Sequence, residues 1–353
     1  GEVAHRLSWQ PWLVDSNRLL RALDTPIRTH YGPDILRELR DTVTDIAAGD
    51  APAKNPTEKA LNHLRMGSTI VGMGWRFSTA AMQLTGLTQS WARVGGRWAA
   101  KGIGQFVTSP LDSSAFVKDK SPFMAARART MNREINEVLN VIRSGEKVSA
   151  LTSSYFTMIT KMQLAVDIPT WLGAYEKGLA QGKYENAAND AQRKEIEDRA
   201  VALADQAVLD SQSGGQIKDL AKVQRGSPLF KLFTNFYSYF SAAYNLNIET
   251  VRRTNFRSPT EIGIALVDVT LINILPVMMT VALKLAMRGG CEPDDLECIT
   301  GKYAQEQLGH FSGQLILLRE MGAAISAATG EQTYGYQGPA GLRFFNDFYK
   351  AGV

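Results

Sequence analysis

The residues of this chain best suited to covalent chemistry are its two cysteines, Cys291 and Cys298, which lie seven positions apart. They could close a short loop by a disulfide in an oxidising compartment such as the bacterial periplasm, or they could remain free thiols. Two cysteines cannot support a disulfide scaffold, so any bridge here is local. The acids between them do not have the spacing of a calcium-binding loop. These acids are Glu292, Asp294, Asp295 and Glu297.

Residue patterns typical of enzymes are missing. The four histidines are scattered, with no cysteine or carboxylate at the spacing of metal ligands. Gly72 and Gly74 supply two glycines of a dinucleotide fingerprint, but Phe77 stands in the third glycine position. The sequence contains no phosphate-binding loop, nucleophile elbow or zinc-protease helix. We therefore expect no catalytic, cofactor-binding or metal-binding residues, and a protein that is not an enzyme.

Composition favours an ordered chain of two or three domain-sized units. Of the 353 residues, 44% are hydrophobic and 21% are charged, which is unlike a disordered protein. The 39 basic and 35 acidic side chains leave a net charge of only +4, so the sequence does not predict a dedicated nucleic-acid surface. Because the chain starts at Gly1 without a leader pattern, we expect a piece of a longer polypeptide, with a trimmed complete protein as the alternative.

Residues 1–60 are expected to form short helices and a linker. Pro11, Pro26 and the Gly32–Pro33 pair should end helices, because proline and the residue before it are unfavourable in a helix interior. Residues 34–48 carry an apolar stripe at helical spacing.

Residues 61–110 are expected to form a helical segment rich in small residues. Gly74, Ser78, Gly86 and Ser90 form a ridge on which another helix, from this chain or a neighbour, could pack closely. Several arginines interrupt the segment, so we expect an interfacial or tightly bundled helix here and not a membrane span.

Residues 111–227 are expected to be amphipathic helices. They include a helix around 131–142, an apolar segment at 151–171 that Asp167 and Pro169 interrupt, and a charged helix from Lys183 to Asp210. Residues 228–353 begin with an aromatic helix, whose stripe we interpret as helix core and not as a platform for base stacking. Its members are Phe233, Phe236, Tyr237, Phe240 and Tyr244.

The segment from Ile262 to Leu283 is the most membrane-like part of the chain, with 22 residues and a single charge, Asp268. About 20 predominantly apolar residues are enough to cross a bilayer. Asp268 should then lie near an interface, in an ion pair or facing a polar lumen, and Pro276 should kink the helix. A buried helix of a soluble protein with a paired aspartate is the alternative. The candidate membrane-contact residues are Ile262, Ile264, Leu266, Leu271, Leu275, Val277, Met278 and Val281.

A second helix, at 303–329, is too polar to span a membrane alone. Packed antiparallel against the first helix in an oligomer, its polar face could line a water-filled interior. Basic residues flank the apolar segment on both sides, so its orientation is only weakly encoded. We therefore predict an all-α, elongated, multi-helix fold with a membrane-capable helical hairpin.

Four blocks of sequence carry a family resemblance. They read MGWRFSTAAMQLTGLTQSWARVG, VDIPTWLGAYEKGLAQGKYENAANDA, DLAKVQRGSPLFKLFTNFYSYFSAAYN and LILLREMGAAISAATGEQTYGYQG. In this order they resemble domains of the large polyvalent proteins of tailed bacteriophages, in particular the C-terminal portions of internal virion, or DNA-ejection, proteins of short-tailed phages. The resemblance covers residues 61–338 and rests on aromatic and glycine blocks, not on a catalytic signature.

The resemblance implies a structural subunit of a genome-ejection apparatus. Such a protein would lie inside the virion and then enter the host cell envelope, at the inner membrane or periplasm. Its expected partners are further copies of itself, other phage ejection proteins, the host membrane and passing double-stranded DNA without sequence specificity. The alternative function is a soluble helical scaffold within a large virion protein, without membrane contact.

Overall fold

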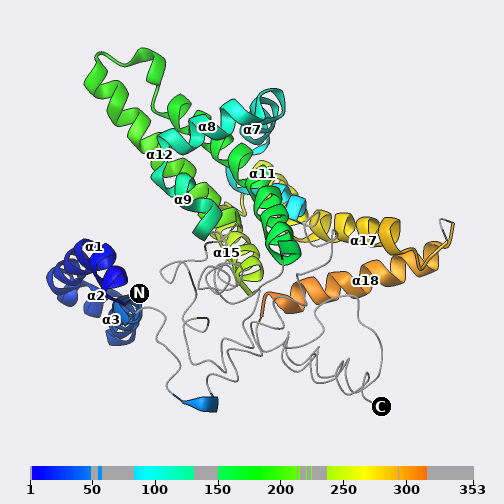
Figure 1. Cartoon of the computed structure of the whole chain (residues 1–353), viewed down its shortest axis with the longest axis horizontal. Helices are drawn as coiled ribbons and strands as arrows, with labels where there is room; N and C mark the ends of the chain where they lie inside the picture. Colours follow the sequence, from blue (N-terminus) through cyan, green and yellow to red (C-terminus); the bar gives the residue numbers. More distant parts are fainter. Residues whose placement is uncertain are drawn as a thin grey trace.

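The computed structural model describes residues 2–48, 55–57, 83–130, 150–212, 214, 220, 224, 237–292 and 294–315. Every secondary-structure element within these ranges is helical (Figure 1). The prediction of an all-α chain is therefore confirmed for the part that the structure describes.

Three helices at the N-terminus contact one another: α1 (Glu2–Ala22), α2 (Asp24–Tyr31) and α3 (Pro33–Ala48). The predicted stop at Gly32 is present, and Gly32 has the positive φ of 88° that favours glycine. The predicted break at Pro11 was wrong, because α1 continues through it. A proline inside a helix removes one backbone hydrogen bond, which the neighbouring turns can tolerate. Pro26 lies in the first turn of α2, where the backbone N–H groups have no intrahelical acceptor.

A central bundle is built around α11 (Ala150–Gln181). Three of its neighbours, α7 (Gly96–Thr108), α8 (Pro110–Lys120) and α12 (Asp190–Gln212), pack against α11. The bundle also contains α6 (Gly86–Val94) and α9 (Pro122–Thr130), and Figure 1 shows its helices in cyan to green.

The core of this bundle forms around Trp171, whose side chain is fully buried. The indole ring stacks on Tyr175 with 4.9 Å between ring centroids, and its Nε1–H donates to Asp205 Oδ1 at 2.7 Å. Val94 and Val117 belong to the same core cluster. The domain boundary expected at residue 110 therefore falls inside one continuous core.

Two glycines allow α7 and α11 to approach each other closely. A Cβ atom on Gly102 would lie 2.1 Å from the backbone oxygen of Pro169, and one on Gly173 would lie 2.5 Å from that of Trp98. Only glycine allows the two backbones to meet at this distance. Asp167 and Pro169, which interrupt the apolar pattern, do not interrupt α11 itself.

The charged helix α12 starts later than expected. It begins at Asp190 and not at Lys183, because Lys183 adopts a left-handed φ of 55° and the chain then forms the short 3-10 helix η2 (Tyr184–Asn186). The side chain of Asn189 accepts a hydrogen bond from the N–H of Gln192 at 2.8 Å and so caps the new helix.

The last described elements are α15 (Tyr237–Arg253), α16 (Pro259–Val269), the π-helical turn η4 (Thr270–Ile274), α17 (Leu275–Arg288) and α18 (Leu296–Gly313). Of the aromatic stripe, Tyr237 is buried and Tyr244 is exposed, whereas Phe233 and Phe236 lie outside the described residues. The sequence Ser258-Pro259-Thr260-Glu261 starts α16, since Ser258 Oγ accepts from the N–H of Glu261.

Candidate functional site

The candidate site is a helical hairpin, which we define as residues 259–315. Its first arm is the continuous helix formed by α16, η4 and α17, and its second arm is α18. Figure 1 shows α17 and α18 lying side by side and joined at one tip. An ion pair of 2.6 Å between Lys284 Nζ and Glu306 Oε1 connects the two arms.

The interior of the hairpin is polar and centred on Asn273, which is almost completely buried. Its side-chain oxygen accepts from Asn247 Nδ2 at 3.0 Å and from Gln314 Nε2 at 2.8 Å. Its side-chain nitrogen donates to Asn247 Oδ1 at 2.8 Å, and its backbone oxygen accepts from Gln307 Nε2 at 3.2 Å. This amide network joins α15, the first arm and α18.

Replacing Asn273 with alanine should lower the free energy of unfolding by about 1–3 kcal/mol, because the amides of Asn247 and Gln314 would lose their buried partner. Thr270→Ala, on the exposed face of the same π-helical turn, is the matched control and should change stability by about 0.5 kcal/mol or less. Urea denaturation of both variants measures the difference. Equal losses would show that the amide network contributes nothing specific.

The π-helical turn has a local cause in Pro276. Proline has no N–H to donate and collides with the carbonyl four residues earlier, so a regular helix is strained at this point. The turn η4 ends at Ile274, two residues before the proline. Donors from α18 lie against it, since His310 makes a hydrogen bond with the backbone of Ile272 and Gln307 donates to Asn273. The predicted disturbance at Pro276 is thus a widened turn that a neighbouring helix supports.

Asp268 is buried and forms an ion pair with Arg253 of α15. This contact anchors the base of the hairpin to the helix that precedes it. A cavity of about 310 Å³ opens beside the pair. The charged side chains that line the cavity are Arg93, Lys177, Arg253, Glu261 and Asp268.

The outer surface of the hairpin is apolar. On the first arm, no exposed residue between Gly263 and Ala282, all of which the structure describes, carries a charge. On α18, the buried residues Glu306, His310 and Gln314 repeat every four positions, and the exposed residues Ala304, Leu308, Phe311 and Leu315 repeat every three or four. We call the exposed residues of 263–282 and 300–315 the apolar band. The outside of the hairpin is therefore apolar, whereas its buried side combines polar residues such as Asn273 and Glu306 with the apolar Ile272.

The predicted membrane-contact residues divide into three groups. Ile264, Leu266 and Met278 are exposed, by 56%, 63% and 52% respectively. Ile262, Leu271 and Leu275 are partly buried. Val277 and Val281 are only 4% and 5% exposed, so the prediction for these two was wrong: they face the inside of the fold and not its surroundings. The error arose because apolar residues occupy every face of this helix, so the sequence pattern does not show which face is buried.

The residues predicted for close helix packing are only partly within the described chain. Gly86 and Ser90 lie where α6 meets α11 and α12: Ser90 Oγ is 2.6 Å from Thr170 Oγ1, and Gln212 Nε2 donates to both Ser90 Oγ and the oxygen of Gly86. Gly74 and Ser78 lie outside the described residues.

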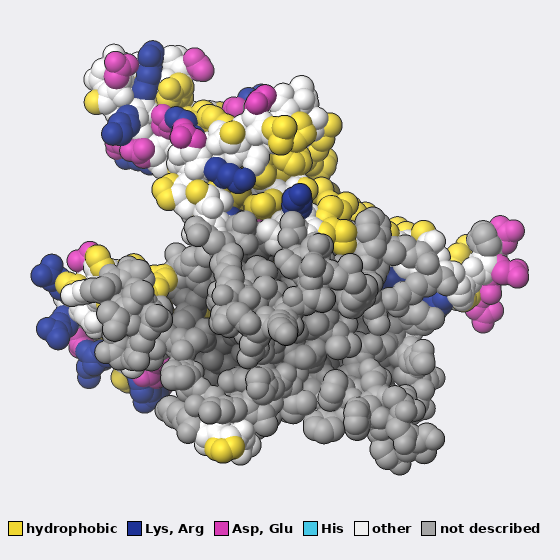
Figure 2. Space-filling model, viewed as in Figure 1, with side chains coloured by type: hydrophobic (Ala, Val, Ile, Leu, Met, Phe, Trp, Pro, Cys, Tyr) yellow, Lys and Arg dark blue, Asp and Glu magenta, His cyan; other side chains and the backbone are white. Residues whose placement is uncertain are grey.

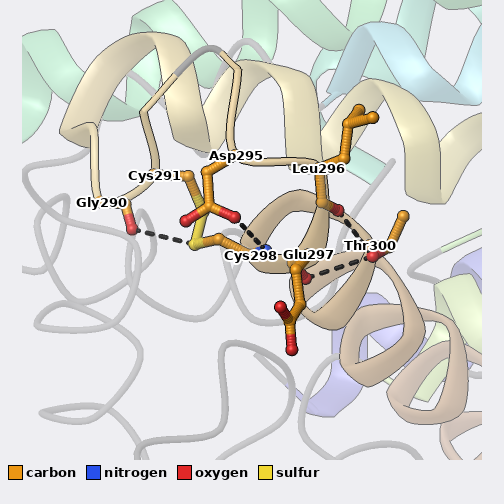
Figure 3. Close-up of a disulfide and its surroundings, with 7 residues drawn as sticks. All are labelled: Gly290, Cys291, Asp295, Leu296, Glu297, Cys298 and Thr300. Carbon is orange, nitrogen blue, oxygen red and sulfur yellow. Dashed lines mark hydrogen bonds between the residues drawn. A yellow bond between two sulfur atoms is a disulfide. The ribbon is translucent and has the colours of Figure 1, made fainter.

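The tip of the hairpin contains a disulfide between Cys291 and Cys298 (Figure 3). Asp295 caps α18 by accepting the N–H of Cys298 at 2.9 Å, and the sulfur of Cys298 lies 3.4 Å from the oxygen of Gly290. The space-filling view shows acidic side chains gathered at this tip, at the far right (Figure 2). Among the described residues, no group of three or more potential ligands could hold a metal ion.

Sequence reasoning missed the polar partners inside the hairpin, namely Asn247, Gln307 and Gln314. The spacing of Glu306, His310 and Gln314 was a usable signal, because it places three polar side chains on one face of a helix. Comparisons with family models, curated proteins and solved structures found no match to this chain. No relative therefore supports the functional assignment, and its structural support is the geometry of the hairpin.

Proposed function

We propose that this chain is a non-catalytic structural subunit that inserts its hairpin into a lipid bilayer. The observation that supports this most directly is the apolar outer surface of the hairpin, together with amides and ion pairs that find their partners on its buried side. In water, an exposed apolar surface of this kind would be unfavourable, whereas in lipid it is the expected arrangement.

The length of the hairpin agrees with this proposal. The helical stretch Pro259–Ala286 has 28 residues and a mean hydropathy of 2.1 in its most apolar window, of which only 28% is buried within the chain. At 1.5 Å per residue, residues 263–282 extend over about 30 Å, the thickness of a bilayer's hydrocarbon core. Asp268 and the amide network do not oppose insertion, because each has a partner inside the fold.

We further propose that the subunit belongs to a phage genome-ejection apparatus, where several copies form or line a conduit for DNA across the host envelope. The support for this step is the sequence resemblance to internal virion proteins, together with a hairpin suited to oligomerisation in a membrane. Neighbouring copies would cover part of the apolar band and lipid the rest. Outside the host, the chain would lie in the virion interior.

A charge placed in the apolar band should weaken membrane binding without unfolding the protein. We expect Met278→Asp to reduce binding to liposomes by about tenfold or more, since an unpaired carboxylate in the hydrocarbon core is costly. Its melting temperature in buffer should stay near that of the wild type, because Met278 is exposed. Flotation with liposomes and thermal melts measure the two effects.

Two controls make this experiment specific. Leu111→Asp places the same charge on an exposed apolar residue of α8, outside the band, and should leave flotation unchanged. Val277→Asp places it next to Met278 but in the interior, and should unfold the protein. A wild-type chain that stays monomeric and lipid-free would contradict the membrane function and favour the soluble scaffold.

A further inference from the structure

The cavity at the base of the hairpin contains charges of both signs beside an apolar wall. Arg93 comes from α6, Lys177 from α11 and Arg253 from α15, so three separate helices bring cations to one cavity. Glu261 and Asp268 of α16 supply the carboxylates, and Ile264 and Ala265 of the same helix supply the apolar wall. This wall is continuous with the apolar band, so the cavity lies where the band begins.

The cations of the cavity keep donor groups available. Arg93 uses Nε for Asp210 at 2.7 Å, and Arg253 uses one terminal nitrogen for Asp268. Lys177 donates to the backbone oxygen of Val94 at 2.9 Å, and the carboxylate of Glu249 also acts on its charge. Each side chain carries more N–H groups than these contacts use. Several N–H groups are therefore available to donate hydrogen bonds to an oxyanion.

Electrostatics within the cavity favour an added anion near Lys177. Burial, followed by repulsion from Arg93 and Arg253, holds the pKa of Lys177 below its ordinary value. A negative group placed among the three cations would relieve this repulsion and accept charge-assisted hydrogen bonds. Glu261 is exposed and lines the same cavity, where it can accept hydrogen bonds from an ammonium group.

We propose that this cavity binds the headgroup of a membrane phospholipid that carries both a phosphodiester and a primary ammonium group, as phosphatidylethanolamine does. Lys177, Arg93 and Arg253 hold the phosphate, Glu261 holds the ammonium, and the acyl chains lie along Ile264 and the apolar band. The inference rests on the proposed membrane function and adds the lipid class that the base of the hairpin recognises. Asp268 already pairs with Arg253, and one oxygen of Glu261 accepts the N–H of Asn255 at 2.8 Å. A purely anionic headgroup would therefore supply no cation for the remaining oxygen of Glu261.

Vesicles of different headgroup composition test the proposal with the full chain. We expect vesicles containing phosphatidylethanolamine to bind about tenfold more tightly than vesicles of phosphatidylcholine alone, whose quaternary ammonium has no N–H to donate, as expected for one charge-assisted hydrogen bond. Glu261→Gln should remove this preference, so that vesicles containing phosphatidylethanolamine bind no more tightly than vesicles of phosphatidylcholine. Lys177→Met should weaken binding to both vesicle types, because both headgroups contain a phosphate.

Lys161→Met, on the exposed surface of the same helix as Lys177, is the matched control and should bind like the wild type. Thermal melts in buffer establish that each variant is folded. Titration with soluble glycerophosphoethanolamine provides a second measurement of how much Lys177→Met weakens headgroup binding. Equal binding of the wild type to both vesicle types, or stronger binding to anionic phosphatidylglycerol, would overturn the headgroup proposal alone. Stabilisation by the soluble headgroup without any vesicle preference would also overturn it. No binding to any vesicle would overturn the membrane function as well.

Discussion

Replacing Asp167 with alanine should lower the free energy of unfolding by about 3–5 kcal/mol, because it leaves a buried arginine without its counter-charge. Arg127 Nε donates to Asp167 Oδ2 at 2.7 Å, and the two side chains are only 1% and 0% exposed. Gln163 Nε2 also donates to Asp167 at 3.0 Å. The two terminal nitrogens of Arg127 have no hydrogen-bond partner among the described residues. Urea denaturation followed by circular dichroism measures the loss.

The partly exposed ion pair of Arg93 and Asp210 is the matched control for this prediction. Its side chains are 23% and 26% exposed, so solvent screens the interaction and Asp210→Ala should cost about 1 kcal/mol or less. The double replacement Arg127→Met with Asp167→Leu should recover much of the stability lost in Asp167→Ala, since no buried charge remains. If Asp167→Ala is no more harmful than Asp210→Ala, the buried pair is not a major determinant of stability.

Replacing Gly102 with alanine should cost about 3 kcal/mol or more, because its Cβ atom would lie 2.1 Å from the backbone of α11. The obstructing atom is a main-chain oxygen, so relief requires α7 and α11 to move apart. Gly86→Ala should cost less, because the nearest atom there is the end of the Gln212 side chain, which can rotate away.

The matched control for Gly102 is two residues further along the same helix. A Cβ on Gly104 meets nothing within 4 Å, and Gly104→Ala should raise stability by about 0.5–1 kcal/mol through the better helix propensity of alanine. Opposite signs for these two substitutions, measured by urea denaturation, are the expected result. Similar losses for both would show that the close approach of α7 and α11 is not what makes Gly102 necessary.

Local signals in the sequence predicted the presence of helices better than they predicted where the helices begin and end. Gly32 ends α2 because glycine alone adopts its backbone conformation without strain, and this can be recognised from the residue type. Pro11 and Pro169 do not end α1 and α11. The cost of the lost backbone hydrogen bond can be offset by packing contacts, which cannot be recognised in the sequence. The late start of α12 depends on the left-handed conformation of Lys183, for which lysine gives no signal.

The hairpin illustrates a second limit of sequence reasoning. The apolar run at 262–283 and the alternating faces of α18 are visible in the sequence, but periodicity does not say which face is buried. Only the structure shows that Glu306 and Gln314 point inward while Leu308 and Phe311 point outward. In the first arm, apolar residues occupy every face of the helix. The sequence therefore did not reveal that Val277 is buried whereas its neighbour Met278 is exposed.

The disulfide at the hairpin tip makes the structure of this tip depend on the redox conditions around the protein. Cytosolic thiols are kept reduced by glutathione and thioredoxin, so the closed loop between Cys291 and Cys298 can persist only outside a reducing cytosol. A newly synthesised chain in such a cytosol would have an open loop that carries four carboxylates between two thiols. The capping contact of Asp295 and the ion pair of Lys284 with Glu306 would then be among the non-covalent contacts that hold the end of the hairpin. In an oxidising environment the disulfide would add a covalent constraint to the contacts at this tip.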